Sequence, residues 1–362
     1  MQGIDLSRRF YSDMVAPWLD DNAPGLLHAA GLIDAGSELL GFDDDVSRDH
    51  DWGPRVQIIL APEDFAAHAR GLVQAFAHDA PEAFLGEPVA WRSRVRAPVS
   101  GPGSASSAGH GLEIHTLASV LERHFALHSL DDIPLKSWLG FAEQRLLAFT
   151  AGPIFRDDSG RLSQARERLA FFPHDIWLYK LACQWRRIAE EQAFVGRAGQ
   201  VGDDLGSRVI AARLVRDVMR MAFLLERRYA PYSKWLGSAF TRLPLAKSLA
   251  PWLDRTLRAE DWVPRGEALA EAYAILAEMQ NGLGIARFAC RIGPYHERPF
   301  VTIDADAAIT ALQAQIADPD IKGMPIMGAL DQVSDLTPLL EDPKLSRKIM
   351  SCLTAPEPIT VP

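Results

Sequence analysis

Apolar residues change their spacing along this chain of 362 residues. In the first third, short apolar runs such as residues 56–60 stand between helical patterns and predict strands. From about residue 117 onward, apolar residues recur every three to four positions, which is the period of one helix face. The pattern predicts an α+β protein with two domains. A small mixed β-sheet flanked by helices would occupy residues 1–130, and an all-α helical domain residues 131–362.

The first part of the chain is expected to mix both kinds of element. The predicted helices are 6–15, 24–30 and 62–78, with a short helix starting at 38–40, and the predicted strands are 32–35, 49–60 and 89–95. Pro17 should end or bend the first helix, because proline removes a backbone donor and clashes with the preceding turn. Residues 101–111, rich in Gly, Ser and Ala, predict a loop.

The remainder of the chain should consist mainly of helices. Their expected ranges are 117–127, 134–149, 162–172, 174–194, 203–228, 251–258, 266–283 and 304–316. A turn or hairpin is expected at residues 151–160, where Pro, Asp-Asp and Ser-Gly occur together. Residues 196–207 are rich in glycine but lack the Gly-Lys-Ser/Thr ending of a phosphate-binding loop. They predict a connection between helices, either ordered beside a cleft or a plain linker.

Composition indicates which partners and which cellular compartment to expect. The net charge of −9 speaks against non-specific binding of nucleic acid, which needs a basic surface. The three cysteines are widely spaced and form no C-x-x-C pair, which is typical of reduced thiols. No signal-peptide pattern and no apolar run of membrane-spanning length are present. We therefore expect a cytoplasmic protein that does not enter a membrane.

Candidate chemistry begins at a small-residue turn. Gly36 and Ser37 form a flexible pair whose neighbouring backbone N–H groups could approach a phosphate. The short helix expected from residue 38 would point its N-terminus toward the same place, which favours an anion.

Two aspartates follow about a dozen residues later. Asp49 and Asp51 precede the apolar run 56–60, and in an extended segment both carboxylates would lie on one face. Two hard oxygen ligands side by side suit Mg²⁺. The alternative is a solvated acidic loop, like the run of three aspartates at residues 43–45.

This order of motifs resembles the nucleotidyltransferase fold of the polymerase-β type, in which Gly-Ser, a short helical spacer and Ser-x-Asp-x-Asp lead into a strand. Aminoglycoside (kanamycin-type) nucleotidyltransferases share that fold. Most of the chain also resembles a bacterial nucleotidyltransferase-like family of unassigned function. The resemblance implies that Gly36 and Ser37 hold the phosphates of an NTP, ATP being the expected one. It also implies that Asp49, Asp51 and a third acidic residue hold two Mg²⁺ ions.

Glu113 is the candidate for that third acidic residue, because it stands among apolar residues on a later run, as the corresponding carboxylate does in the family. It would be a metal ligand or the general base. The alternative is a glutamate on an edge strand without a catalytic role. Arg228 and Lys234 lie near the end of a predicted helix and could reach the β/γ-phosphates. Alternatively, they are solvated cations that interact favourably with the helix dipole.

The resulting prediction is a Mg²⁺-dependent enzyme that transfers a nucleoside monophosphate from an NTP to an acceptor hydroxyl. A small-molecule acceptor is favoured, because a cationic acceptor would be attracted to an acidic cleft. A protein or tRNA acceptor stays open. The alternative function is a non-catalytic member of the same fold that binds a nucleotide or a partner, as an antitoxin-like component or a scaffold.

Overall fold

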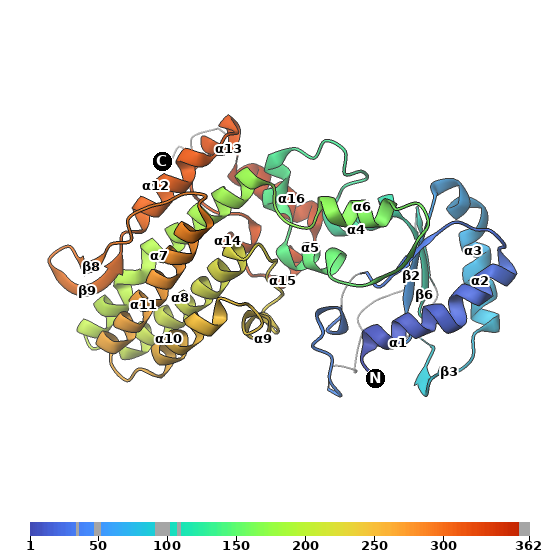
Figure 1. Ribbon diagram of the computed structural model, residues 1–362, viewed down its shortest axis with the longest axis horizontal. Helices are drawn as coiled ribbons and strands as arrows, with labels where there is room; N and C mark the ends of the chain where they lie inside the picture. The colour runs from blue at the N-terminus through green and yellow to red at the C-terminus, as the bar shows by residue number, and fades with distance from the viewer. Residues whose placement is uncertain (34–35, 47–51, 91–101, 107–109, 355–362) are drawn as a thin grey trace. The chain divides into compact units, whose positions relative to one another are not determined.

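The structure, a computed structural model, describes residues 1–33, 36–46, 52–90, 102–106 and 110–354 (Figure 1). The chain forms two compact units, the first comprising residues 1–132 and 145–170 and the second residues 133–144 and 171–362. The five-stranded sheet belongs to the first unit, and the second is mainly helical, which confirms the α+β fold class. Residues 145–170 pack with the first unit, and the predicted division into domains at residue 130 stays a prediction.

The main sheet has the strand order β5-β6-β2-β1-β7. β2 and β6 run parallel, and the other neighbouring strands pair antiparallel. The strands are β1 (Ala29–Gly31), β2 (Val56–Leu60), β5 (Ser104–Ser106), β6 (Leu112–Thr116) and β7 (Ile154–Asp157). β3 (Ala83–Phe84) and β4 (Glu87–Pro88) form a separate two-stranded antiparallel sheet. Because β6 lies between β5 and β2, Glu113 is not on an edge strand.

One face of this sheet is covered by helices from the N-terminal part of the chain. They are α1 (Gly3–Phe10), η1 (Tyr11–Val15), α2 (Ala16–Asn22) and α3 (Pro62–Asp79) (Figure 1). Phe10 and Phe76 pack edge to face within this core, with ring centroids 6.1 Å apart. The core also contains Val56, Ile58 and Ile114, so the apolar positions of β2 and β6 point toward these helices.

The first helix continues through Pro17 instead of ending there. Residues 11–15 form a π-helical stretch, and α2 begins at Ala16 with the proline in its first turn. A proline ring clashes with the carbonyl four residues before it, and a locally wider helix relieves that clash. The prediction of a helix at 6–15 is therefore confirmed, with a change of helix type in place of a break.

Two predictions between residues 24 and 35 are wrong. No helix forms at 24–30, because Gly25 adopts a left-handed φ of 78° and the chain then extends into β1. The strand is therefore Ala29–Gly31 instead of 32–35, and residues 34–35 lie outside the described residues. A side chain at Gly31 would come 2.9 Å from the carbonyl oxygen of Pro153, which explains the small residue at this position.

The other predictions for this unit had mixed outcomes. The helix at 62–78 is confirmed as α3. Of the strand expected at 49–60, residues 49–51 lie outside the described residues, and the described part forms β2 from Val56 onward. The predicted loop at 101–111 contains β5, which pairs with β6. The strand expected at 89–95 falls largely outside the described residues. The remaining helices of this part are α4 (Leu117–Phe125), α5 (Glu143–Thr150) and α6 (Arg161–Arg168).

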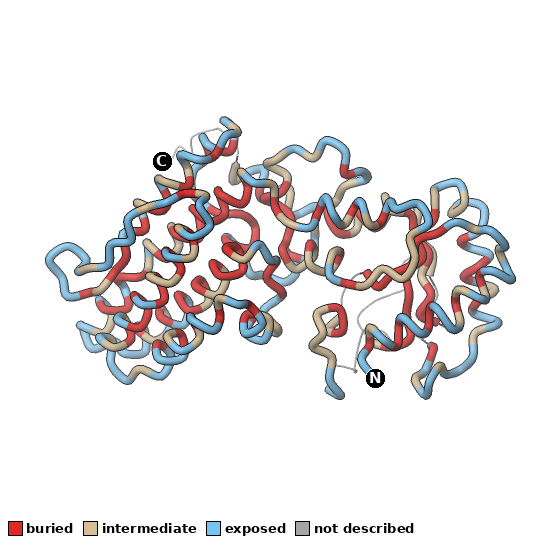
Figure 2. Tube along the Cα trace, in the orientation of Figure 1, coloured by how far each residue is buried: buried red, intermediate tan, exposed pale blue. Residues whose placement is uncertain are grey.

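The second unit is built around three long helices that contact one another: α7 (His174–Gln200), α8 (Asp204–Leu225) and α11 (Trp262–Leu283). Figure 2 marks the buried positions along them in red. The other elements are η4 (Leu135–Gly140), α9 (Leu236–Phe240), α10 (Ala246–Arg258), β8 (Ile292–Tyr295), β9 (Arg298–Ile303), α12 (Ala305–Gln315), α13 (Pro319–Lys322), α14 (Leu330–Val333), α15 (Thr337–Leu340) and α16 (Pro343–Leu353). In the described part of the chain, no helix combines the length and the apolar character needed to cross a membrane.

The glycine-rich segment at residues 196–207 is mostly helical, contrary to the prediction of a connection. α7 runs to Gln200, and only residues 201–203 separate it from α8. Gly196 and Gly199 lie within α7, where a Cβ would run into the ring of Phe300 or Trp262. These glycines therefore allow close packing against the helix and do not mark a loop.

Candidate active site

The centre of the main sheet has one apolar and one polar face. Ile58 and Ile114 point into the hydrophobic core. Because side chains alternate along a strand, Gln57 and Glu113 point to the opposite face. The parallel register of β2 and β6 places these two residues next to each other. The Glu113 side chain is 23% exposed, so a carboxyl group remains accessible on an otherwise buried part of the sheet.

A series of hydrogen bonds holds Glu113 in place. Gln57 Nε2 donates to Glu113 Oε2 at 3.2 Å, and Gln57 Oε1 accepts from the backbone N–H of Ile33 at 2.9 Å. His115 Nε2 lies 3.1 Å from the same carboxylate oxygen, and its Nδ1 lies 3.0 Å from Ser104 Oγ. Because a carboxylate only accepts, Nε2 carries the proton, and in the neutral ring Nδ1 accepts from the Ser104 hydroxyl.

Sequence reasoning did not single out Gln57 and His115, although both leave a signal. Gln57 is the one polar residue in the apolar run 56–60, and His115 stands two positions from Glu113, a spacing that shares one strand face. The sequence does not contain the pairing of β2 with β6, which brings the two runs together.

The turn at residues 36–37 is closed by a buried ion pair. The Glu38 carboxylate contacts the Arg55 guanidinium, and both side chains are at most 5% exposed. Burial raises the pKa of Glu38, although the charge of Arg55 opposes this shift. Gly36 has a φ of 139°, and a Cβ there would run into both charged groups, so the position requires glycine.

Ser37 leads from this turn into η2 (Glu38–Leu40), a single 3₁₀ turn that confirms the short helix expected there. Binding of phosphates by Gly36 and Ser37 stays a prediction.

Asp49 and Asp51, the predicted metal ligands, lie outside the described residues. The chain is anchored on both sides of them, because Asp43 Oδ2 accepts from the Trp52 indole at 3.1 Å and from the backbone N–H of Gly3 at 2.6 Å. Among the residues that the structure describes, no three His, Cys, Asp or Glu side chains group as a metal site. The roles of Asp49, Asp51 and Glu113 in binding Mg²⁺ therefore stay predictions.

The predicted phosphate-binding cations belong to the second unit, whereas Gly36 and Glu113 belong to the first. Arg228 is exposed and follows α8 in a turn. Lys234 is also exposed, and its ammonium lies 4.9 Å from the ring centroid of Trp235. Both side chains are accessible, and their contact with a nucleotide stays a prediction.

Comparisons with known proteins add two likenesses. Residues 138–236 match the model of a family described as "Domain of unknown function (DUF4037)". The chain is also similar to a solved nucleotidyltransferase-like protein from Exiguobacterium sibiricum 255-15, at 10% sequence identity and a TM-score of 0.36, over 80% of this chain and 83% of the other. Values this low do not establish a common fold or activity. No curated protein matches the chain.

Proposed function

We propose that the chain is a Mg²⁺-dependent nucleotidyltransferase that transfers a nucleoside monophosphate from an NTP to an acceptor hydroxyl, with a small molecule as the favoured acceptor. Asp49, Asp51 and Glu113 would hold the metal ions, and Gly36 and Ser37 would contact the triphosphate. Phosphoryl transfer also requires cations that neutralise the phosphates, and Arg228 and Lys234 are the residues predicted for this role.

The position of Glu113 carries the proposal. It stands on an interior strand, on the face opposite the hydrophobic core, and lies in register with Gln57 of β2. The chain enters β2 a few residues after Asp51. A third carboxylate beside the strand that follows two aspartates is the arrangement that the resemblance implies. The donor set fits Mg²⁺, because carboxylate oxygens are its preferred protein ligands.

The reaction would proceed by in-line attack. The acceptor oxygen forms a bond to the α-phosphorus, the bond from that phosphorus to the bridging oxygen of the β-phosphate breaks, and pyrophosphate leaves. Glu113 would accept the acceptor's proton or hold metal, and the hydrogen bonds from Gln57 and His115 fix its carboxyl group. The chemistry supplied by Mg²⁺ at such a site is charge neutralisation on the phosphates and activation of the acceptor oxygen.

Pyrophosphate release tests the proposal. The full chain is incubated with Mg²⁺, each NTP in turn and a panel of aminoglycoside acceptors, and label transfer from α-labelled NTP to the acceptor or to the protein itself is followed in parallel. We expect Mg²⁺-dependent release, reduced about a hundredfold or more by Asp49→Asn, Asp51→Asn or Glu113→Gln, because each removes a charge that stabilises the transition state.

Glu63→Gln provides the matched control, because Glu63 is an exposed carboxylate in the first turn of α3. This variant should release pyrophosphate at the wild-type rate. If the wild-type chain neither binds nor turns over any NTP with Mg²⁺, the enzymatic proposal is wrong, and the non-catalytic alternative is favoured.

A further inference from the structure

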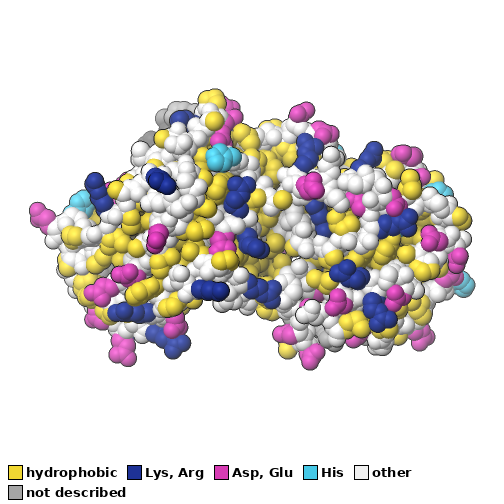
Figure 3. Space-filling view, viewed as in Figure 1, with side chains coloured by type: hydrophobic (Ala, Val, Ile, Leu, Met, Phe, Trp, Pro, Cys, Tyr) yellow, Lys and Arg dark blue, Asp and Glu magenta, His cyan; other side chains and the backbone are white. Residues whose placement is uncertain are grey.

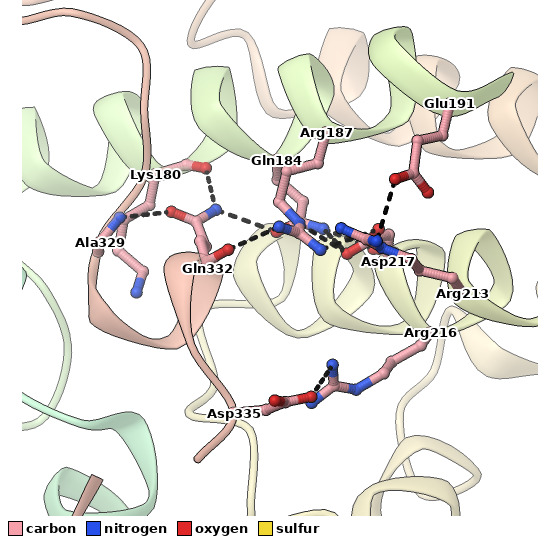
Figure 4. A network of polar contacts seen from close by, with 10 residues as sticks. All are labelled: Lys180, Gln184, Arg187, Glu191, Arg213, Arg216, Asp217, Ala329, Gln332 and Asp335. Atoms are coloured by element: carbon pink, nitrogen blue, oxygen red, sulfur yellow. Dashed lines mark hydrogen bonds and ion pairs between the residues drawn. The ribbon is translucent and has the colours of Figure 1, made fainter. Parts of the chain in front are cut away.

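The second unit contains a network of polar contacts between α7, α8 and the segment around α14, and Arg187, Arg213 and Arg216 take part in it (Figure 4). Arg213, Arg216 and Arg220 follow one another at three and four residues on α8, so they lie along one side of the helix. Arg187 of α7 joins them. The face drawn in Figure 3 carries both basic and acidic side chains.

Three of the four arginines have acidic partners. Arg187 Nε lies 3.0 Å from Asp217, and its Nη1 donates to the Gln332 carbonyl oxygen at 2.6 Å. Arg213 pairs with Glu191 at 3.1 Å. Arg216 pairs with Asp335, also at 3.1 Å, in a contact that stands apart from the rest of the network in Figure 4.

Arg220 differs from these three. Its Nε is buried and has no hydrogen-bond partner in the described part of the chain, and none of the ion pairs found there involves it. A charged hydrogen-bonding group is costly to bury without a partner. Nη1 and Nη2 of Arg220 are not among the buried atoms without a partner, so they are the nitrogens that an anion from solution can contact.

Two buried carboxyl groups, those of Glu143 and Asp331, attract Arg220 without forming an ion pair with it. Glu143 is already paired with Lys180 at 2.9 Å, and both side chains are buried. Asp331 accepts from the backbone N–H of Glu143 at 2.9 Å. Burial, and then the charge of Glu143, raises the pKa of Asp331, although the charges of Lys180 and Arg220 oppose this shift. Both carboxyl groups therefore make their printed contacts with residues other than Arg220.

Arg216 lies among charges of both signs. Burial, and then the positive charge of Arg220, lowers its pKa, while the charges of Asp335 and Asp217 oppose this shift. Like charges one helical turn apart on a helix repel each other. Its partner Asp335 is 67% exposed and comes from the segment that follows α14, so it is the member of the pair that a ligand can displace.

We propose that Arg216 and Arg220 form a binding site for the phosphate group of a small ligand, and that Asp335 occupies Arg216 when the ligand is absent. Guanidinium groups match phosphate oxygens in geometry and can each donate two hydrogen bonds to them. A phosphate monoester carries nearly two negative charges, so it can neutralise both arginines, which the single carboxylate of Asp335 cannot. The site stands independently of the nucleotidyl transfer proposed above.

Binding of tripolyphosphate and of ATP to the full chain, measured by isothermal titration calorimetry at low ionic strength, tests this site. The buffer contains EDTA, so that binding through Mg²⁺ at the predicted carboxylate site does not contribute. Arg220→Gln and Arg216→Gln should each weaken binding roughly ten- to hundredfold, because each removes hydrogen bonds to a charged group. Asp335→Asn should strengthen binding severalfold, because the competing carboxylate is lost.

Arg213→Gln is the matched control, because Arg213 lies on the same side of α8 but is paired with Glu191. It should bind like the wild type, and the far-UV circular dichroism and thermal midpoints of all variants show whether they fold. Equal weakening for tripolyphosphate and ATP supports a site for phosphate alone. Binding of ATP only, with the same losses, supports a site for a nucleotide. Absence of binding by the wild type, or binding that Arg220→Gln leaves unchanged, overturns the proposal.

Discussion

A lysine and a glutamate are buried together in the second unit. The Lys180 ammonium lies 2.9 Å from Glu143 and 4.3 Å from the ring centroid of Phe172. The Glu143 carboxylate also accepts from the backbone N–H of Ala230 at 2.9 Å. Burial would raise the pKa of Glu143, but the charges of Lys180 and Arg220 outweigh burial and lower it. The ionised pair is therefore the folded form, and each charge depends on the other.

Removing one partner should show this dependence. Lys180→Met leaves the Glu143 carboxylate buried without its main counter-charge, and we expect a loss of about 3–5 kcal/mol in the free energy of unfolding. The double variant Lys180→Met with Glu143→Gln should recover part of the loss, because no charge is then left uncompensated. Urea denaturation followed by circular dichroism measures both.

Lys136→Met serves as the comparison, since Lys136 pairs with Asp320 at 3.4 Å on the surface of the same unit. An exposed pair contributes about 1 kcal/mol or less. If Lys180→Met and Lys136→Met lower the free energy of unfolding equally, the buried pair contributes no more to stability than an exposed one.

Among the elements, α7 shows how helix propensity and packing can oppose each other. Alanine stabilises a helix interior over glycine by about 1 kcal/mol. At Gly199, however, a methyl group would run into the ring of Trp262, and such overpacking costs about 1–3 kcal/mol. Gly199→Ala should therefore lower the free energy of unfolding by up to about 2 kcal/mol, as measured by urea denaturation.

Gly266→Ala gives the opposite expectation. Gly266 lies within α11, and a Cβ there would meet nothing within 4 Å. The free energy of unfolding of this variant should be about 0.5–1 kcal/mol higher than that of the wild type. If both substitutions stabilise the protein to the same extent, Trp262 does not pack against α7 as described.

The elements that could be predicted from the sequence are those with a long apolar repeat, such as α3, α7, α8 and α11. β1 could not, because Ala29, Ala30 and Gly31 carry no pattern and become a strand only through pairing with β2 and β7. The hairpin of β8 and β9 was missed for a similar reason, since Gly293 and Pro294 interrupt its first strand. Tertiary pairing decides such segments, and local sequence does not record it.

At the candidate site, too, local sequence predicts single residues, and tertiary pairing decides which residues contact one another. The sequence predicts Glu113 on an apolar run, and the structure places it on a strand beside Gln57. Its hydrogen-bonding neighbours follow from strand register, which sequence periodicity does not fix. The buried pair of Glu38 and Arg55 joins residues 17 positions apart, and no local spacing rule predicts such a contact.

At the scale of the whole molecule, the first unit is discontinuous in sequence. Residues 145–170 belong to it and supply β7, which pairs with β1, and Phe155, which stacks on Tyr11 with ring centroids 5.8 Å apart. A fragment that ends at residue 132 lacks this strand, so β1 keeps β2 as a neighbour but becomes an exposed edge strand. We expect fragment 1–132 to show no cooperative thermal unfolding by circular dichroism.

The comparison fragment contains residues 1–170 with positions 133–144 replaced by a Gly/Ser linker of equal length. It restores β7 and α6 and should unfold cooperatively. Cooperative unfolding of fragment 1–132 at the same midpoint would mean that the first unit does not need residues 145–170.

The interleaving of the two units has a consequence for proteolysis. The chain passes between them at residues 132/133, 144/145 and 170/171. A protease that cuts only one of these junctions leaves two covalent connections in place. Nicked protein should therefore keep its native mass on a sizing column while it already runs as two bands on a denaturing gel.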